Sequence, residues 1–215
     1  MEKDLSSYRK SYEKGALLLS EVPENPMELF QKWFFEVDKF FAEDETNAMI
    51  ISTIGVDGYP KNRVVLLKKY TYEGFIFFTN YASEKGKAIE QNPNVCLSFF
   101  WHGAERQVII KGKAEKVAEN LSDGYFESRP RGSQLGALAS NQSEVVEDRD
   151  FLEQKLSDLE KEFEGKDVPR PTNWGGYIVK PVEIEFWQGR PNRLHDRIRY
   201  QLQPDYNWLI HRLSP

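Results

Sequence analysis

Short runs of strand-forming residues, separated by tight turns such as Asp57-Gly58, occupy most of this chain and constrain its fold more than any other feature. They fill residues 47–117 and return after residue 175, with few helices between them. An antiparallel sheet closed into a barrel, with helices outside it, fits this pattern. We therefore predict a fold that is mainly β with flanking helices. The expected strands are 48–54, 63–68, 74–79, 95–101, 107–117, 176–187, 197–202 and 208–213.

An arm and one helix precede the strands. Asn25, Pro26 and Glu28 form a typical helix start, and apolar residues then recur at helical spacing as far as residue 41. We expect this helix to pack on the sheet. Residues 1–25 are expected to form an arm and residues 26–215 a single domain. The acidic segment 144–164 is expected to be a solvated amphipathic helix.

Composition limits the classes of function. The chain has 34 acidic and 29 basic residues, and a net charge of −5 argues against nucleic-acid binding, which needs a basic surface. No run reaches the roughly 18 apolar residues of a membrane span, and the polar start has no signal-peptide pattern. We therefore expect a soluble, cytoplasmic protein without a membrane partner. The single cysteine, Cys96, excludes an internal disulfide and lies in an apolar run, which predicts a buried structural thiol.

Two basic side chains bracket an apolar run in one of the expected strands. Arg63 and Lys68 are five positions apart, so on one strand they would point to opposite faces. Each cation must either extend to water or meet an anion. The sequence leaves both interpretations open.

Two further clusters combine hydroxyl groups with basic side chains. Residues 79–87 open an expected helix, where backbone N–H groups and Lys85 suit a phosphate, although ordinary helix capping explains the same residues. Residues 125–134 contain Tyr125, two arginines and Ser133 around a proline and a glycine. These side chains suit a phosphate dianion, and the alternative is a solvated turn.

The C-terminal segment is basic within an acidic chain. From Trp187 onward it carries five arginines, no lysine and two acids, a net charge of +3 without its histidines. In an extended conformation Arg193, His195 and Arg197 would share one face and could hold a charged aromatic ring. Alternatively, the arginines pair with the acidic segment 144–164.

No nucleophile or metal constellation accompanies these clusters. The three histidines have no metal-ligand spacing, and the Gly-rich phosphate loops and the nucleophile elbow are absent from the sequence. We therefore predict no metal site. Because the clusters offer binding groups but no evident nucleophile, we predict that an organic cofactor supplies the chemistry.

Seven blocks follow one another in an order typical of one enzyme family: residues 63–68, 105–108, 128–130, 174–176, 185–189, 193–197 and 212–215. The match extends from the arm near Arg9 to the last residue and so covers nearly the whole chain. On these blocks the chain resembles the pyridoxine/pyridoxamine 5′-phosphate oxidase family, which uses FMN. The resemblance implies an FMN-binding split β-barrel that works as a homodimer with flavin at the subunit interface.

The resemblance also assigns roles to individual residues. Those implied to contact FMN are Arg63, Val64, Val65, Leu66, Lys68, Phe78, Thr79, Lys85, Gln107, Gln142, Ser143, Trp187 and Arg197. Those implied to contact the substrate are Arg9, Tyr12, Lys68, Tyr125, Arg129, Ser133, Arg193, Leu194 and His195. Of these, Arg193 and His195 would be catalytic, and Arg9 and Tyr12 belong to an arm that folds over the site.

The implied reaction oxidises C4′ of pyridoxamine or pyridoxine 5′-phosphate. A hydride equivalent passes to N5 of FMN, dioxygen reoxidises the flavin, and the products are pyridoxal 5′-phosphate, hydrogen peroxide and, from the amine, ammonia. Glu84 departs from the family's frequent Ser-Arg-Lys pattern. Its carboxylate would weaken FMN binding if it faced the phosphate, and would not if it turned outward; Lys87 stands nearby to compensate.

Three other functions remain open at this stage. The chain could be a split-barrel oxidoreductase with another substrate, although the phosphate-binding and C-terminal blocks argue against it. It could store flavin or pyridoxal phosphate without turnover. It could also be an interaction protein whose arginine-rich end binds an acidic partner, which would leave the ordered blocks unexplained.

Overall fold

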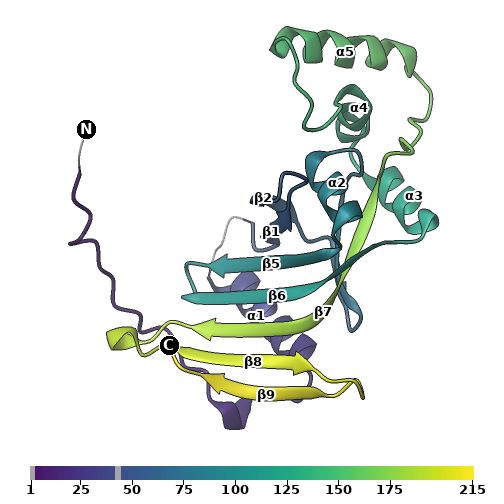
Figure 1. Ribbon diagram of the computed structural model, residues 1–215. Helices are drawn as coiled ribbons and strands as arrows, with labels where there is room; N and C mark the ends of the chain where they lie inside the picture. Colours follow the sequence, from purple (N-terminus) through teal and green to yellow (C-terminus); the bar gives the residue numbers. More distant parts are fainter. Residues whose placement is uncertain (1–2, 42–44) are drawn as a thin grey trace. The chain divides into compact units, whose positions relative to one another are not determined.

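The computed structural model describes residues 3–41 and 45–215, and Figure 1 labels most of their helices and strands. They divide into two compact units, each built from segments that are distant in the sequence. Unit 1 comprises Met1–Ile50, Leu97–Lys111 and Pro181–Pro215, and unit 2 comprises Ile51–Cys96 and Gly112–Lys180. Four strands contribute residues to both units: β1 (Ala48–Ile54), β5 (Asn94–Trp101), β6 (Arg106–Lys116) and β7 (Trp174–Gln188).

One sheet contains the nine strands found in the described residues. Its order is β2-β1-β5-β6-β7-β4-β3, with β8 paired to β7 and β9 paired to β8. The pairs β3–β4, β4–β7, β7–β8 and β8–β9 are antiparallel. The prediction of a mainly β fold with flanking helices is therefore confirmed.

Unit 1 is organised around α1 (Pro26–Phe40). The Asn25 side chain accepts a hydrogen bond from the Met27 N–H at 2.9 Å, so the helix begins where the sequence predicts. The buried ring of Phe30 lies 5.3 Å from that of Phe99, which fixes the apolar face of α1 on its core. The remaining elements of this unit are η1 (Leu19–Glu21), η2 (Pro191–Arg193), β8 (Asp196–Leu202) and β9 (Trp208–Leu213).

Unit 2 contains the other strands and four helices. The strands are β2 (Pro60–Leu66), β3 (Lys69–Thr71) and β4 (Gly74–Asn80), and the helices are α2 (Glu84–Gln91), α3 (Glu119–Ser128), α4 (Arg131–Ala139) and α5 (Arg149–Glu162). Its core includes Phe75 and Phe77, both fully buried. A second cluster joins helices to the start of β7 through Phe126, Leu135, Val168 and Trp174. These helices carry several of the predicted site residues.

Most predicted elements agree with the structure to within one to three residues. The short strand β3 was not predicted. α5 lies inside the acidic segment and buries none of its residues, as expected for a solvated helix. The prediction of a buried thiol is wrong, because Cys96 is only half-buried. None of the described helices combines the length and the apolar character needed to cross a membrane.

Candidate functional site

A cavity of about 430 Å³ in unit 2 collects most of the predicted binding residues of that unit. We call it the anion pocket. It is formed by the end of β2, by β4, and by the starts of α2, α4 and β7. Its lining residues are Val64, Val65, Leu66, Lys68, Phe78, Thr79, Lys85, Tyr125, Arg129, Pro130, Ser133, Gln142 and Trp174. Only Arg63 and Ser143, among the predicted site residues of this unit, do not line it.

Lys85 is the buried cation of the anion pocket. Its Nζ donates to Thr79 Oγ1 at 3.0 Å, to Gln142 Oε1 at 2.5 Å and to Ser83 Oγ at 3.3 Å, all of them uncharged acceptors. Burial lowers the pKa of Lys85 to about 8; the nearby Arg63 adds to this, and Glu84 opposes it. A bound anion would relieve this cost by supplying the missing negative charge.

Two arginines in unit 2 keep unused hydrogen-bond donors. Arg63 Nη1 donates to Thr53 Oγ1 at 2.6 Å, but its Nη2 is buried without a partner among the described residues. Arg129 Nη1 is also buried and unpartnered there, and burial lowers the pKa of Arg129. An unsatisfied buried donor costs about 1–3 kcal/mol, and more when it is charged. Both groups are therefore suited to a strong acceptor such as a phosphate.

Stacked aromatic rings form one wall of the anion pocket. Phe78 stacks on Tyr125 with ring centroids 3.9 Å apart, and Trp174 stacks on Phe78 at 5.6 Å. Gly176 makes room for Phe78, because a Cβ on this glycine would lie 2.8 Å from the Phe78 ring. Arg129 lies over Trp174 at 4.8 Å. Residues 125–134 therefore contribute to a packed wall of the pocket and do not form the solvated turn that the sequence allowed as an alternative.

The start of α4 completes the anion pocket. Pro130 precedes the helix and gives no side-chain cap, and Pro130 and Ser133 both line the cavity. The first N–H groups of a helix carry a partial positive charge that favours an anion. Sequence reasoning missed Pro130 and Trp174 as pocket residues, although both stand in blocks that carried the resemblance.

Glu84 and Ser143 are adjacent in the sequence to the pocket residues Lys85 and Gln142, but they do not line the cavity themselves. Glu84 binds Lys61, with Nζ 2.6 and 2.8 Å from its two carboxylate oxygens, and both side chains are well exposed. The carboxylate is thus turned outward, one of the two possibilities left open. Ser143 is exposed and has a left-handed φ of 77°. Ser83 caps α2 by accepting a hydrogen bond from the Gly86 N–H. This confirms helix capping, the alternative explanation for residues 79–87.

A second cavity, of about 610 Å³, lies in unit 1 and brings the N-terminal arm to the segment after β7. We call it the arm pocket. It joins Arg9 and Tyr12 to Arg193 and His195, as the resemblance implied, whereas Leu194 is 69% exposed and does not line it. Its lining residues are Tyr8, Arg9, Lys10, Ser11, Tyr12, Arg190, Asn192, Arg193 and His195.

His195 is held in one orientation in the arm pocket. Its Nδ1 accepts the Arg190 N–H at 3.1 Å, and its ring lies 4.7 Å from that of Trp187 and 5.8 Å from that of Tyr12. Burial, followed by the charge of Arg193, lowers the pKa of His195. The neutral ring therefore carries its proton on Nε2, because Nδ1 must keep its lone pair for Arg190. In this state His195 is a hydrogen-bond donor.

The prediction that Arg193, His195 and Arg197 share one face of an extended segment is wrong. Pro191–Arg193 forms a 3-10 turn in which Asn192 and Arg193 have φ values of 57° and 60°. Strand alternation therefore does not apply before β8. The Arg197 guanidinium binds both Glu185 oxygens, at 2.8 and 3.1 Å.

Three of the five C-terminal arginines pair with acids of their own unit. Arg190 and Arg212 pair with Asp196, as Arg197 does with Glu185, and no ion pair of the described residues joins these arginines to segment 144–164. Three residues that the resemblance implied to contact flavin, Gln107, Trp187 and Arg197, belong to unit 1. Their roles stay predictions.

Comparison with known proteins gives two family matches. Residues 36–162 match the model described as pyridoxamine 5′-phosphate oxidase, and residues 174–215 match the pyridoxine 5′-phosphate oxidase C-terminal dimerisation region. A pyridoxine/pyridoxamine 5′-phosphate oxidase from Flavobacterium psychrophilum is 67% identical over 213 residues, 99% of this chain and 100% of the relative. The oxidase of that name from Christiangramia forsetii is 53% identical over the full length of both chains.

Solved structures share the fold. PhzG from Burkholderia lata 383, in complex with tetrahydrophenazine-1-carboxylic acid, has a TM-score of 0.86 and 27% identity, covering 93% of this chain and 98% of its own. A pyridoxamine 5′-phosphate oxidase-related, FMN binding protein from Nostoc punctiforme has a TM-score of 0.68 at 13% identity, covering 91% of this chain and 100% of its own. The prediction of the split-barrel fold of FMN-binding proteins is confirmed.

Proposed function

Because this chain belongs to the pyridoxine/pyridoxamine 5′-phosphate oxidase family, we propose that it oxidises pyridoxamine or pyridoxine 5′-phosphate to pyridoxal 5′-phosphate, with FMN as its cofactor. Dioxygen would be the electron acceptor. The observation that carries the proposal is a set of cationic groups without acidic partners in or beside the anion pocket. They are Lys85, which is buried and has a lowered pKa, and the buried, unpartnered donor atoms of Arg63 and Arg129.

The residues present fit FMN. Arg63 and Lys85 would hold its phosphate, with Gln142 beside Lys85 and Ser143 in the same turn. The apolar side chains of Val64, Val65 and Leu66, together with Phe78 and Thr79, would line the isoalloxazine ring. When bound, FMN supplies a two-electron acceptor for C4′ of the substrate and a route for those electrons to dioxygen, which is released as hydrogen peroxide.

A second set of groups fits the substrate phosphate. Lys68, Tyr125, Arg129 and Ser133 line the same cavity, and Arg129 offers a buried donor to an oxygen. Bidentate donors and the start of α4 suit a phosphate dianion. Fixing the phosphate far from C4′ would orient the ring, so binding energy is used to position the reacting carbon.

Arg193 and His195 would act at the other end of the substrate. Arg193 lines the arm pocket and makes no ion pair within the described residues, so its charge is free to face an anionic or electron-rich ring. His195 would donate from Nε2 to a ring substituent, since its Nδ1 is occupied by Arg190. Neither residue has to remove a proton for this role; both stabilise one orientation of the substrate.

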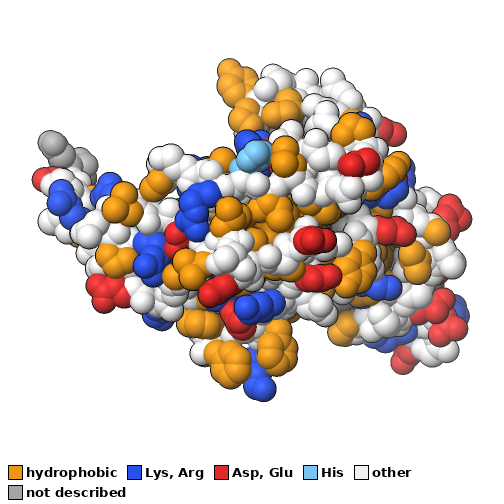
Figure 2. Space-filling model, turned by 90° about the horizontal axis from the view of Figure 1, so that it is seen from below, with side chains coloured by type: hydrophobic (Ala, Val, Ile, Leu, Met, Phe, Trp, Pro, Cys, Tyr) orange, Lys and Arg blue, Asp and Glu red, His pale blue; other side chains and the backbone are white. Residues whose placement is uncertain are grey.

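We further propose that the enzyme is a homodimer with flavin at the interface, so that the arm pocket of one copy serves the anion pocket of the other. The match to a C-terminal dimerisation region supports it. Large apolar side chains also stay exposed in both units, including Val64 at 67% and Leu194 at 69%. Apolar patches beside basic side chains are visible on the face drawn in Figure 2.

The visible spectrum of the purified protein, mixed anaerobically with pyridoxamine 5′-phosphate, tests the function. We expect a flavin spectrum that bleaches on mixing and returns with air as pyridoxal 5′-phosphate forms. A flavin that does not bleach would contradict the proposed substrate and favour another oxidoreductase or storage. A protein that stays colourless after FMN is added would contradict the cofactor.

A further inference from the structure

Glu105 is a buried acid outside both pockets, in the turn between β5 and β6. Its side chain is 2% exposed, and its φ of 56° lies in the left-handed region, which is rare for a glutamate. Its carbonyl accepts the Gly189 N–H at 2.8 Å, so the turn is attached to the end of β7. A buried carboxylate at a strained position needs compensating partners.

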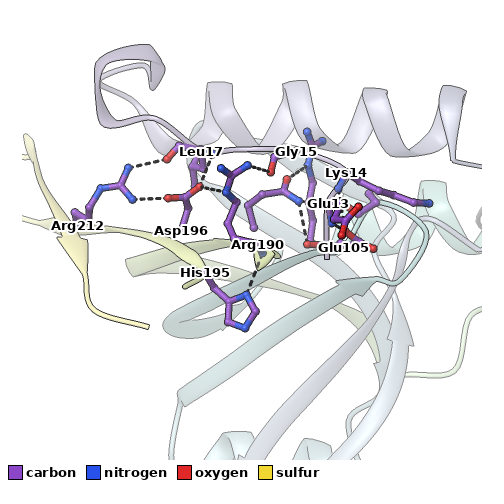
Figure 3. A network of polar contacts seen from close by, with 12 residues as sticks. Glu13, Lys14, Gly15, Leu17, Glu105, Arg190, His195, Asp196 and Arg212 are labelled. Atoms are coloured by element: carbon purple, nitrogen blue, oxygen red, sulfur yellow. Dashed lines mark hydrogen bonds and ion pairs between the residues drawn. The ribbon is translucent and has the colours of Figure 1, made fainter. Parts of the chain in front are cut away.

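Those partners come from the N-terminal arm. Glu105 Oε2 accepts the backbone N–H groups of Glu13 at 2.8 Å and Lys14 at 3.0 Å, as Figure 3 shows. Its Oε1 lies 3.2 Å from Lys10 Nζ. Burial opposes ionisation of Glu105, but the hydrogen bonds from Lys14 and Glu13 and the charge of Lys10 outweigh it and lower the pKa. The Glu105 carboxylate, which anchors the arm, therefore stays charged near neutral pH.

A second anchor holds the arm a few residues later. Asp196 Oδ2 accepts the Leu17 N–H at 3.0 Å, and Arg212 joins Asp196 to the Leu17 carbonyl. Arg190 Nη1 donates to the Gly15 carbonyl at 2.8 Å. These contacts surround the start of β8 in Figure 3. They fix residues 15–17. Residues 10–14 are held by the Glu105 carboxylate, together with the bond from Lys14 Nζ to the Gly103 carbonyl and the packing of Tyr12.

Tyr12 lies within the part of the arm that Glu105 holds. Its ring meets Trp187 edge to face at 5.7 Å and lies 5.8 Å from His195. It also packs on the backbone of Gly189, where a Cβ would come within 2.8 Å of it. The arm wall of the arm pocket therefore depends on a carboxylate that does not line that pocket.

We propose that Glu105 is a positioning residue whose buried carboxylate holds residues 10–14 in place and so keeps Arg9 and Tyr12 over the arm pocket. The proposal rests on the proposed function, in which that pocket receives the substrate. In this role Glu105 contacts neither the substrate nor the flavin. Its effect reaches the reaction only through the arm.

The first test uses limited trypsin digestion of the full-length protein, which needs no substrate. E105A removes the acceptors for Glu13, Lys14 and Lys10, so cleavage after residues 9, 10 and 14 should become about tenfold faster or more. E105Q keeps the shape and one acceptor oxygen, and should fall between E105A and the unmodified chain. E13Q is the matched control: Glu13 is exposed and only its backbone N–H reaches Glu105, so its cleavage rate should not change. Equal cleavage rates in E105A and E13Q would overturn the proposal.

The second test separates positioning from general structural damage. E105A should raise KM for pyridoxamine 5′-phosphate about tenfold and leave kcat and bound FMN nearly unchanged, since the arm closes over the substrate. Combined with Y12A, it should add little to the KM effect of Y12A alone, because both act through one segment. Additive effects, or equal losses of kcat and FMN, would overturn it. Failure of the unmodified protein to turn over would contradict the proposed function and leave the digestion result standing.

Discussion

The anion pocket and the arm pocket are both rich in cations, but they balance that charge differently. In the anion pocket Lys85 bonds only to neutral oxygens, and the buried donors on Arg129 in the pocket and on Arg63 beside it lack partners within the described residues. In and around the arm pocket, Lys10 pairs with Glu105 and Arg190 with Asp196. The first pocket thus depends on a ligand for its negative charge, whereas much of the second is neutralised by the chain.

This difference predicts different responses to substitution. A buried cation that has no acidic partner in the chain strengthens the binding of an anionic ligand, but it lowers the stability of the ligand-free protein. A cation paired within the chain contributes to the shape of the site. We therefore expect changes in the anion pocket to weaken the binding of flavin or of the substrate phosphate. Changes in the arm pocket should alter KM or kcat for the substrate and leave flavin retention unchanged.

The largest expected effect is that of Arg193→Ala. Arg193, like Arg9, is an arm-pocket cation with no ion pair among the described residues, so it has a charge to offer the substrate. Its loss should lower kcat by about a hundredfold, the scale on which a small misplacement of the reacting groups slows a reaction, and leave FMN content unchanged. Steady-state kinetics and the flavin-to-protein ratio measure this. Equal loss of flavin and turnover would show that Arg193 is misplaced in this account.

Lys85→Met should act in the opposite way. It removes the buried ammonium next to Gln142 and Thr79, so FMN should bind about 10- to 100-fold more weakly, as expected for a charge-assisted hydrogen bond. KM for the substrate, measured at saturating FMN, should change little. Lys87→Met is the control, because Lys87 is exposed on the same helix. Equal flavin affinity in both variants would remove Lys85 from the FMN site.

FMN affinity should also depend on pH through Lys85, whose pKa is about 8 in the ligand-free protein, against 10.5 ordinarily. A bound phosphate favours the charged amine, so affinity should fall as pH rises above 8, by at most about tenfold per pH unit. Between pH 8 and 10.5 the unfolded chain binds more protons, so the free energy of unfolding of the flavin-free protein should rise with pH. Fluorescence titrations from pH 7 to 9 measure the affinity. An identical pH profile in Lys85→Met would contradict the assignment.

The smallest expected effect is that of Glu84→Arg. The carboxylate binds exposed Lys61 and does not line the anion pocket. Exposed ion pairs contribute about 0–1 kcal/mol, so FMN affinity should change by no more than about fivefold. A large gain in affinity in the same titration would mean that Glu84 reaches the phosphate when flavin is bound.

The sequence predicts the elements better than the details of the sites. The helix after Asn25 and eight of the nine strands follow from capping and periodicity, which are local properties. β3, at Lys69–Thr71, is too short to show a period. The opposite-face argument for Arg63 and Lys68 does not apply, because β2 ends at Leu66 and Lys68 lies beyond it.

The features of the site that the sequence did not predict depend on contacts between segments that are far apart in the sequence. The left-handed turn at Asn192 and Arg193 follows a proline and has no clear pattern in the sequence. Glu105 stands in a recognised block, yet its contacts with residues 10–14 join positions about 90 apart. Residue types indicated which chemistry was present, but only the fold shows which charges are already paired.

Complementation between inactive subunits tests the central claim, that the two pockets are complementary halves of one site formed by two copies of the chain. Arg193→Ala subunits and Lys68→Ala/Arg129→Ala subunits would be purified separately, unfolded, mixed in equal amounts and refolded with FMN. A mixed dimer should contain one site with both pockets intact, so random pairing should restore about a quarter of the activity of the unmodified protein refolded in the same way. Refolded alone, the Arg193→Ala variant should keep only about one hundredth of that activity, and the Lys68→Ala/Arg129→Ala variant should also stay far below a quarter of it. If the mixture is no more active than the variants alone, while mixed dimers are shown to be present, the claim is contradicted.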